Sequence, residues 1–354
     1  RAPKVAPVGR PMSSRTTPPR PVDVEVLFPA LADHRRTTTR LHPRPGSPTV
    51  RDSSVGGPLL WPADEPWPMC TEPHKRDSGR RPENIRRYRR VLAAAWARTP
   101  APGERPGPTD EERELLTELQ RRHRVPDLPD TAPIPMIGLA QLYRRDIPDL
   151  TAGPADRDLL QLFWCPFDAH SAPGGLLHGM SLRLHWRDSG AVTDATAVLD
   201  TPQPEPEVVG FDGYVPEPCV LHPEQVTEYQ YADLLPPDLR DAIDEWDADG
   251  DLYQYDLSIT EGWKVGGYAS WHLTDPYPMN CADCATPMEL LLAIDSYEWD
   301  GRESSWTPME DRGVTLPMRD VKTPTQVMVG RTGTGYVFIC PTDPVAHPHR
   351  ISVQ

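Results

Sequence analysis

The sequence contains no run of about 18 consecutive apolar residues, which excludes a membrane-spanning helix by the usual length criterion. It also lacks a Gly-x-Ser-x-Gly motif and any evident Ser, His and Asp arrangement, so nothing in it points to a serine hydrolase. Lysine is scarce, since only four of the 37 basic residues are Lys. The first 20 residues are basic and rich in Pro but lack the apolar core of a signal peptide. We therefore expect a soluble, cytoplasmic protein, with the removal of an earlier leader left open.

Charge is distributed unevenly along the 354 residues, whose net charge is -15. Residues 1–126 hold 24 Lys and Arg against 15 Asp and Glu, whereas residues 127–354 hold 13 against 37. This asymmetry indicates either an anionic partner or attraction between two parts of one chain. The basic, Pro-rich tail over residues 1–21 has little to bury. We expect Arg10, Arg15 and Arg20 of this tail to lie near carboxylates of residues 200–320.

A comparison of the chain with itself reveals a repeat. Residues 55–69 read VGGPLLWPADEPWPM and residues 265–279 read VGGYASWHLTDPYPM, with seven identities in fifteen positions. Further along, PMIGLAQL at 135–142 parallels PMELLLAID at 287–295. Both copies then end on the pattern F-x-C-P-x-D, at 163–168 and at 338–343. The same order of landmarks occurs twice, which indicates an internal duplication.

The repeat landmarks predict a β-rich α+β fold with two tandem pseudo-symmetric repeats. Short apolar runs at 137–142, 159–164, 181–186, 290–294 and 335–339 favour strands. The Gly-Gly pairs allow positive φ or close backbone approach, and the Pro-rich segments after them are not helix interior. We predict a tail at 1–21, repeat 1 at 22–186, a connecting segment packed on the repeats at 187–262, and repeat 2 at 263–354.

An insertion at 75–130 distinguishes the first copy, and it contains two predicted helices. Apolar residues at helical spacing predict one helix over 85–96. Thr109-Asp110-Glu111-Glu112 is a capping-box pattern that opens a second helix, running to about 124. A further helix is predicted at 236–246, within the connecting segment.

The cysteines and histidines fall on the repeat landmarks in metal-ligand spacings. The second copy offers Cys281-x2-Cys284 and Cys340-x6-His347, with His349 as a rival for the last ligand. The first copy offers Cys70-x3-His74 and Cys165-x4-His170. Four N and S ligands in two short pairs are typical of structural Zn²⁺. Six cysteines are also compatible with disulfides, and this alternative stays open.

Two further groups of residues are candidates for binding. Trp61, Trp67, Trp271 and Tyr277 occupy matching positions in the two copies, and we expect them to line a cleft framed by the repeats. Arg86, Arg87, Arg89 and Arg90 on the first predicted helix could contact the phosphates of a nucleic acid. A solvated helix face explains these arginines equally well.

The runs SSVGGPLLWPADEPWP, IPMIGLAQLYRRDIPDL and LLQLFWCP resemble the YwqG-like family of bacterial domains of unknown function. The resemblance covers residues 50–186 closely and residues 263–350 more loosely. In the second copy, Ala293-Ile294-Asp295 departs from the family's Ala-Gln-Ile/Leu-Asp pattern. The resemblance implies an internally repeated, β-rich fold and no particular reaction.

These observations favour a non-enzymatic binding or interaction protein with a protein partner and one or two structural zinc sites. A metal-dependent hydrolase is the alternative, and it requires three protein ligands and a water on one zinc. Binding of an anionic partner by the basic N-terminal third is a further alternative. The sequence specifies neither the ligand nor the biological process.

Overall fold

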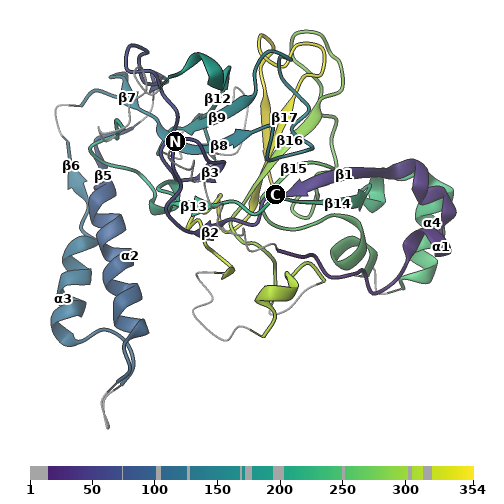
Figure 1. The fold of residues 1–354 in the computed structure, drawn as a ribbon, viewed down its shortest axis with the longest axis horizontal. Coiled ribbons are helices and arrows are strands. Elements are labelled where there is room, and N and C mark those ends of the chain that lie inside the picture. Colours follow the sequence, from purple (N-terminus) through teal and green to yellow (C-terminus); the bar gives the residue numbers. More distant parts are fainter. Residues whose placement is uncertain are drawn as a thin grey trace, which may run out of the picture.

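The computed structural model describes residues 15–73, 75–100, 105–125, 128–167, 170–171, 178–193, 203–248, 252–301, 305–313 and 321–354. The fold is of the α+β class and rich in β structure, as predicted. Two six-stranded sheets dominate it, and every pair of neighbouring strands in them is antiparallel (Figure 1).

The two sheets draw on strands from most of the chain. In spatial order, the first sheet consists of β2 (Arg44–Pro45), β13 (Cys219–Val220), β3 (Ser54–Val55), β8 (Ile137–Tyr143), β9 (Leu159–Trp164) and β12 (Leu182–Arg187). The second sheet consists of β14 (Glu224–Tyr229), β1 (Arg35–Arg40), β15 (Lys264–Gly266), β16 (Glu289–Asp295), β17 (Thr334–Ile339) and β18 (Arg350–Val353).

The strand registers of the two sheets correspond. Val55 of β3 lies opposite Ala140 of β8, and Val265 of β15 lies opposite Leu292 of β16. Both central strands carry an irregularity one residue earlier, between Gly138 and Ala140 in β8 and between Leu290 and Leu292 in β16. An extra residue in one strand of a pair bends that strand and increases its twist. Both sheets are therefore distorted at the same landmark of the repeated sequence.

One hydrophobic core is shared by the two sheets. It contains Leu162 and Trp164 of β9 together with Val337 and Ile339 of β17, all of them buried. Side chains alternate along a strand, so the remaining residues point to the opposite face of each sheet. There, Phe163 belongs to a second cluster beside the first sheet, and Phe338 belongs to a third beside the second sheet. Burial on both faces explains why these strands read as continuous apolar runs.

The buried Gln141 of β8 holds the segments on both sides of β3. Its side-chain oxygen accepts a 2.9 Å hydrogen bond from the Leu60 N–H, and its amide nitrogen donates to the carbonyls of Val50 and Asp52. A buried amide is tolerated only when its hydrogen bonds are made, and here both of its ends are satisfied. The corresponding residue of the second sheet is Ala293.

The predicted domain boundaries do not follow the sheets. Strand β1, from the segment assigned to repeat 1, lies in the second sheet between β14 and β15. The segment 187–262, which we expected to pack on the repeats, supplies β13 to the first sheet and β14 to the second. Pairing between distant strands depends on tertiary contacts, so a local sequence pattern could not reveal this exchange.

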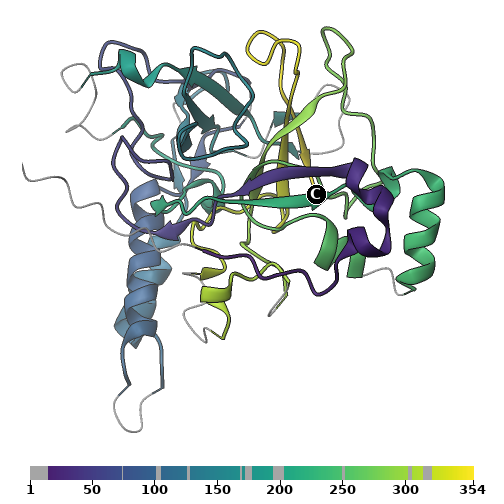
Figure 2. The same ribbon diagram turned by 45° about the vertical axis from the view of Figure 1, so that its right-hand side comes forward.

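The segment predicted to be an insertion forms a helical hairpin that projects beyond both sheets (Figures 1 and 2). It consists of α2 (Pro82–Ala97) and α3 (Asp110–Leu119). The Thr109 side chain accepts from the Glu112 N–H, and the Glu112 carboxylate accepts from the Thr109 N–H, so the predicted capping box is present. At its base, β5 (Ser78–Gly79) pairs with β6 (His123–Arg124), which closes the insertion.

The remaining elements are short. The helices are α1 (Val24–Leu27), the predicted α4 (Pro237–Trp246), a π-helix (Leu252–Ser258) and 3-10 turns such as Pro29–His34 and Met309–Asp311. The ladders are β4 (Met69–Cys70) with β7 (Ile134–Pro135) and β10 (His170–Ser171) with β11 (His178–Gly179). None of the helices in the described ranges is long and apolar enough to cross a membrane.

Candidate metal centre

Two short segments at one end of the second sheet bring four candidate ligands together. Cys281 and Cys284 lie in the turn before β16, where the Cys281 N–H donates to the Thr286 carbonyl and the Ala285 N–H donates back to the Cys281 carbonyl. Asn280 and Pro287 form a β-bridge at the base of this turn. Cys340 directly follows β17 and is fully buried.

The loop after Cys340 delivers the histidine. The Asp343 carboxylate accepts hydrogen bonds from the Val345 and Ala346 N–H groups, at 3.1 and 2.9 Å. The Asp343 carbonyl accepts from the His347 N–H at 3.2 Å. These bonds form one tight turn, which brings His347 back beside Cys340.

The four ligand atoms of Cys281, Cys284, Cys340 and His347 all lie within 4.8 Å of one another. His347 Nδ1 is 3.2 Å from Cys340 Sγ and 3.5 Å from Cys281 Sγ, and the Cys284 and Cys340 sulfurs are 3.5 Å apart. A Zn–S bond of about 2.3 Å and a Zn–N bond of about 2.0 Å in a tetrahedron require separations close to these. The group could therefore hold a metal ion. None of these three cysteines forms a disulfide in this structure.

Of the two rival histidines, His347 belongs to the cluster and His349 does not. The His349 ring is instead hydrogen-bonded to the backbone of Leu182, on β12 of the other sheet, and burial lowers the pKa of its imidazole. The alternative left open by the sequence is thereby decided in favour of His347 as the fourth member.

The surroundings of the sulfurs favour thiolates, which are the form that binds metals. Burial acts to raise the pKa of Cys340, but hydrogen bonds from the Asp343 backbone and from His347 lower it to about 6. The Thr286 hydroxyl and backbone N–H lower the pKa of Cys284. Burial raises the pKa of Cys281, and the hydrogen bond to Cys340 raises that of the His347 imidazole. The donors around Cys340 and Cys284 are those that a bound thiolate needs.

Beside the first sheet, the structure brings two of the four predicted ligands together. Cys70 and Cys165 are both buried, and the hydrogen bond between them together with burial raises the pKa of the Cys165 thiol. Cys70 ends β4 and Cys165 follows β9, as Cys281 and Cys340 precede β16 and follow β17. His74 and the side chain of His170 lie outside the described residues. The ligand set of the first copy thus stays a prediction.

The four aromatic residues predicted to line a cleft lie in two separate clusters. Trp61 packs edge-on against Trp67 in the cluster beside the first sheet, with 5.3 Å between the ring centroids. Trp271 packs edge-on against Tyr277 at 4.9 Å, beside the second sheet. Trp61 and Trp271 are buried, whereas Tyr277 is 41% exposed. The prediction of a common cleft gains no support from this packing.

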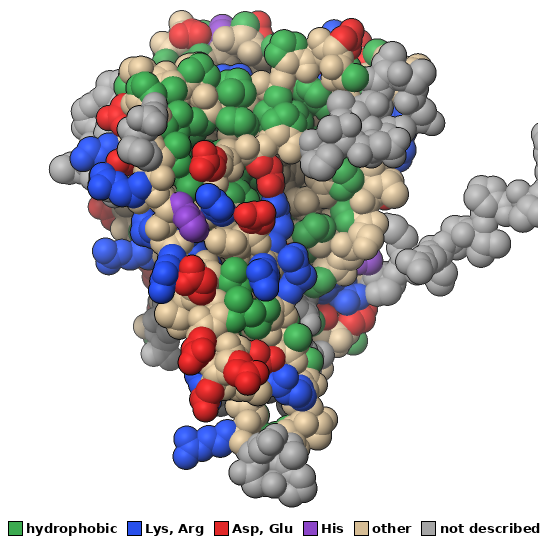
Figure 3. Space-filling model, turned by 90° about the vertical axis from the view of Figure 1, so that its left-hand side faces the viewer, with side chains coloured by type: hydrophobic (Ala, Val, Ile, Leu, Met, Phe, Trp, Pro, Cys, Tyr) green, Lys and Arg blue, Asp and Glu red, His purple; other side chains and the backbone are tan. Residues whose placement is uncertain are grey.

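The arginines of α2 do not form a free basic surface. Arg89 is buried, donates to the Val215 carbonyl and pairs with Glu217 at 3.1 Å. Arg86 forms an ion pair with Glu205. On the face drawn in Figure 3, basic side chains over the hairpin alternate with acidic ones. Of the four arginines predicted to contact phosphates, Arg86 and Arg89 thus bind acidic residues or carbonyls of this chain. Arg87 and Arg90 do not share these partners.

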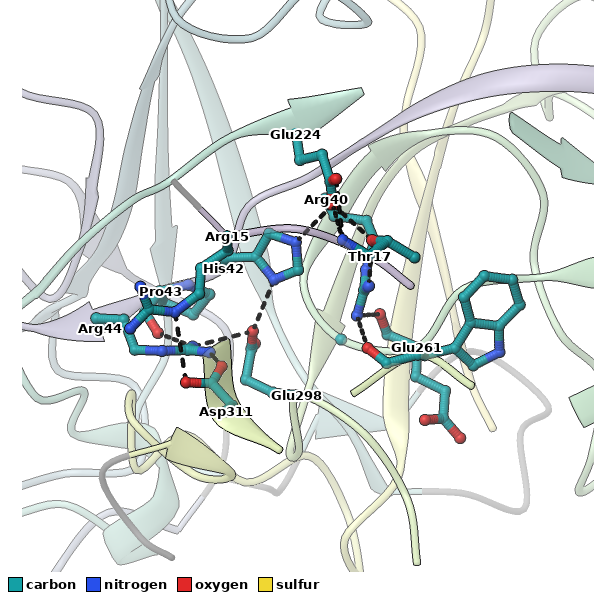
Figure 4. Close-up of polar contacts among 12 residues, drawn as sticks. Arg15, Thr17, Arg40, His42, Pro43, Arg44, Glu224, Glu261, Glu298 and Asp311 are labelled. Atoms are coloured by element: carbon teal, nitrogen blue, oxygen red, sulfur yellow. Dashed lines mark hydrogen bonds and ion pairs between the residues drawn. The ribbon is translucent and has the colours of Figure 1, made fainter. Parts of the chain in front are cut away.

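A buried ionic cluster is the feature that the sequence analysis missed. His42 lies between Glu224, at 3.3 Å, and Glu298, at 3.8 Å (Figure 4). Arg44 pairs with Glu298 at 3.4 Å and also with Asp311. The members come from distant parts of the chain, and no local spacing connects them. The charge asymmetry was the only signal of it in the sequence.

This cluster also receives the N-terminal segment. Arg15 lies 3.4 Å from Asp311, and the Thr17 N–H and hydroxyl both donate to Glu224. Arg20 donates to the carbonyls of Leu257 and Thr227 and lies over the rings of Tyr229 and Trp306. Arg15 is thus near a carboxylate of the acidic body as expected, Arg20 is held mainly by carbonyls and rings, and Arg10 lies outside the described residues.

No protein-family model matches the chain, and a search of curated proteins finds no match either.

Proposed function

We propose that this chain is a non-enzymatic binding protein whose C-terminal unit is stabilised by a structural Zn²⁺ held by Cys281, Cys284, Cys340 and His347. The convergence of three sulfurs and one imidazole nitrogen within 4.8 Å is the observation that carries the proposal. A ligand set rich in thiolates selects Zn²⁺ over the hard cations, which prefer oxygen.

The ligand count supports a structural role. Catalytic zinc sites usually keep three protein ligands and leave one position for water or substrate. Here four protein ligands would complete the tetrahedron, so the hydrolase alternative lacks its open position. The metal would tie the turn before β16 to the loop after β17, and its binding free energy would add to the folding free energy of the second sheet.

We further propose that the chain arose from two copies of one β unit, related by pseudo-symmetry, with the helical hairpin inserted in the first. The matching strand orders, the matching registers around Val55 and Val265 and the shared irregularity in β8 and β16 support this. Membership of the YwqG-like family is part of the same proposal, because the resemblance implies an internally repeated fold. In this scheme, the Cys70 and Cys165 pair is the counterpart of Cys281 and Cys340.

Elemental analysis of the purified full-length chain tests the metal proposal. We expect at least one equivalent of zinc per chain, with a second equivalent if the first copy also binds metal. Cys284→Ser should lower the zinc content by one equivalent and lower the thermal unfolding temperature. Cys219→Ala is the matched control, because Cys219 is buried in the shared core and belongs to neither predicted ligand set. Zinc content unaffected by Cys284→Ser would contradict the proposal.

A further inference from the structure

A hollow of about 500 Å³ lies at the seam between the two sheets, and its two walls come from different units. One wall is strand β12, which forms an outer edge of the first sheet, with Pro154, Asp156 and Arg157 of the loop before β9 beside it. The other is the loop that carries His347, and it contributes Pro344, Val345 and His349 as well. The candidate metal centre therefore stands directly behind one wall of the hollow.

The pattern of lining residues shows that the hollow follows the edge of β12 and not one of its faces. Leu182, Arg183, Leu184, His185 and Trp186 all line it. Consecutive side chains of a strand point to opposite faces, so a hollow that touches five in a row must run along the strand edge. Five residues at about 3.3 Å each span roughly 13 Å from first to last.

The register of β12 identifies which backbone groups point into the hollow. The Cys165 N–H donates to the Ser181 carbonyl, so the odd-numbered residues of β12 face β9. The even-numbered residues Leu182, Leu184 and Trp186 then turn their N–H and C=O groups to the open edge. The hydrogen bond between the His349 ring and the Leu182 backbone agrees with this assignment, because it requires the backbone of Leu182 to point away from β9. Within the described ranges, the edge groups of Leu184 and Trp186 have no strand beside them.

Two guanidinium groups stand at this edge. Arg157 and Arg183 line the hollow, and three histidines beside them offer imidazole groups for hydrogen bonding. Among the described lining residues, Asp156 is the one carboxylate, and it lies 3.6 Å from Arg157. Nearby Glu65 is already paired with Arg187, at 2.8 Å. A ligand here would thus meet hydrogen-bonding backbone groups in front of it and guanidinium groups at its sides.

We propose that β12 is a docking edge for an extended acidic peptide segment of a partner protein, which adds to the first sheet as a further strand. This rests on the proposed binding function and names its class of partner. Strand addition satisfies the edge N–H and C=O groups, and alternate side chains of the added strand supply specificity. Acidic side chains on one face would reach Arg183, while apolar side chains on the other would contact Leu184 and Trp186.

A fluorescein-labelled hexapeptide of alternating Glu and Val, titrated against the full chain by fluorescence anisotropy, tests the proposal. We expect saturable binding, and much weaker binding of a Lys and Val hexapeptide. Arg183→Glu should weaken binding of the acidic peptide by about tenfold or more, equivalent to one charge-assisted contact. Arg113→Glu is the matched control, because Arg113 is an exposed arginine on α3, away from this edge.

Backbone methylation separates strand addition from simple charge attraction. N-methylation of alternate residues in one register should abolish binding, and methylation in the other register should leave it unchanged, because only one set of N–H groups faces β12. Equal binding of both methylated peptides would overturn strand addition, as would failure of the acidic peptide to bind. The zinc content of each sample is measured in parallel. A zinc-loaded chain that does not bind contradicts only this inference, whereas a chain that binds without zinc contradicts only the metal proposal.

Discussion

Lys264 of β15 and Glu228 of β14 form an ion pair in which neither side chain is exposed to solvent. The two strands flank β1 on opposite sides, so the pair reaches across the strand that comes from the N-terminal part of the chain. Glu228 also accepts hydrogen bonds from Thr260 and from the Tyr268 N–H, at 2.7 and 2.9 Å. Removal from solvent lowers the pKa of Lys264, and the neighbouring Glu228 opposes that effect.

Substitution of Lys264 by Met should destabilise the protein by about 3–5 kcal/mol, because it leaves the Glu228 carboxylate buried without its cation. Urea unfolding at pH 7 measures the loss. The double variant Lys264→Met with Glu228→Gln should be more stable than Lys264→Met alone, since it removes the uncompensated charge. A double variant no more stable than the single one would show that the ion pair is not the source of the loss.

The second glycine of the repeated Gly-Gly pair gives a second prediction. Gly267 has a φ of +74°, and a Cβ there would lie 2.1 Å from a Glu228 carboxylate oxygen. Gly267→Ala should therefore be destabilising both through backbone strain and through displacement of Glu228. Gly301→Ala is the matched control, because Gly301 has a φ of +61° with nothing near its Cβ position. We expect Gly267→Ala to lower the free energy of unfolding more than Gly301→Ala, and equal losses would contradict the steric argument.

Asp295 at the end of β16 gives a prediction for pH dependence. It is buried, and desolvation raises its pKa to about 6 from an ordinary value of 3.8, although the Gly262 and Tyr297 N–H groups donate to it. The folded state thus binds this proton more tightly than the unfolded state. The corresponding contribution to stability is complete below about pH 4 and is lost as the pH rises through about 6.

The free energy of unfolding of Asp295→Asn, measured by urea from pH 4 to 8, checks this prediction. A shift of about two pKa units corresponds to roughly 3 kcal/mol. Between pH 4 and pH 8, the free energy of unfolding of the wild type should fall by up to about 3 kcal/mol relative to that of the variant. Parallel pH profiles for the two proteins would contradict the raised pKa.

Much of the local structure was predictable from the sequence. The run at 159–164 became β9 with the same bounds, and the Thr109 and Glu112 pattern became a capping box. These features depend on residues close in sequence. The spacing of Cys281 and Cys284 is also local. Cys340 could be grouped with them because all three residues fall on landmarks of the repeat.

The exchange of β1 into the second sheet and the buried ionic cluster were not predictable. Arg44, Glu298 and Asp311 meet only because strand β2, which holds Arg44, and the loop after β16 pack together. Charged residues are usually exposed to solvent, so their positions in the sequence do not indicate which of them are buried. The sequence did not show that the two aromatic pairs lie in separate clusters for a related reason: Trp and Tyr serve equally well as core residues and as binding residues, and packing decides between the two roles.

The attachment of the N-terminal segment gives the last prediction. The Thr16 N–H donates to Glu310 and the Thr17 N–H donates to Glu224, each at 2.9 Å. Both amides should therefore exchange with deuterium more slowly than those of an unstructured chain. The pairing of tail arginines with carboxylates that the sequence predicts would be weakened by salt if the pairs were exposed. The structure instead places the Arg15 and Asp311 pair largely away from solvent and holds Arg20 by carbonyls and rings. Salt screens such contacts less than exposed ion pairs.

We accordingly expect 0.5 M NaCl to leave most of this protection in place, and Glu224→Ala to remove it at Thr17. Hydrogen exchange followed by mass spectrometry of a peptide covering residues 15–20 measures both effects. Glu118→Ala on α3 is the control, because that carboxylate pairs with Arg121 and contacts no part of the segment. Protection that disappears at 0.5 M NaCl in the wild type would show that exposed charge pairing alone holds the segment. Protection unchanged by Glu224→Ala would show that the hydrogen bond to Thr17 is not what fixes it.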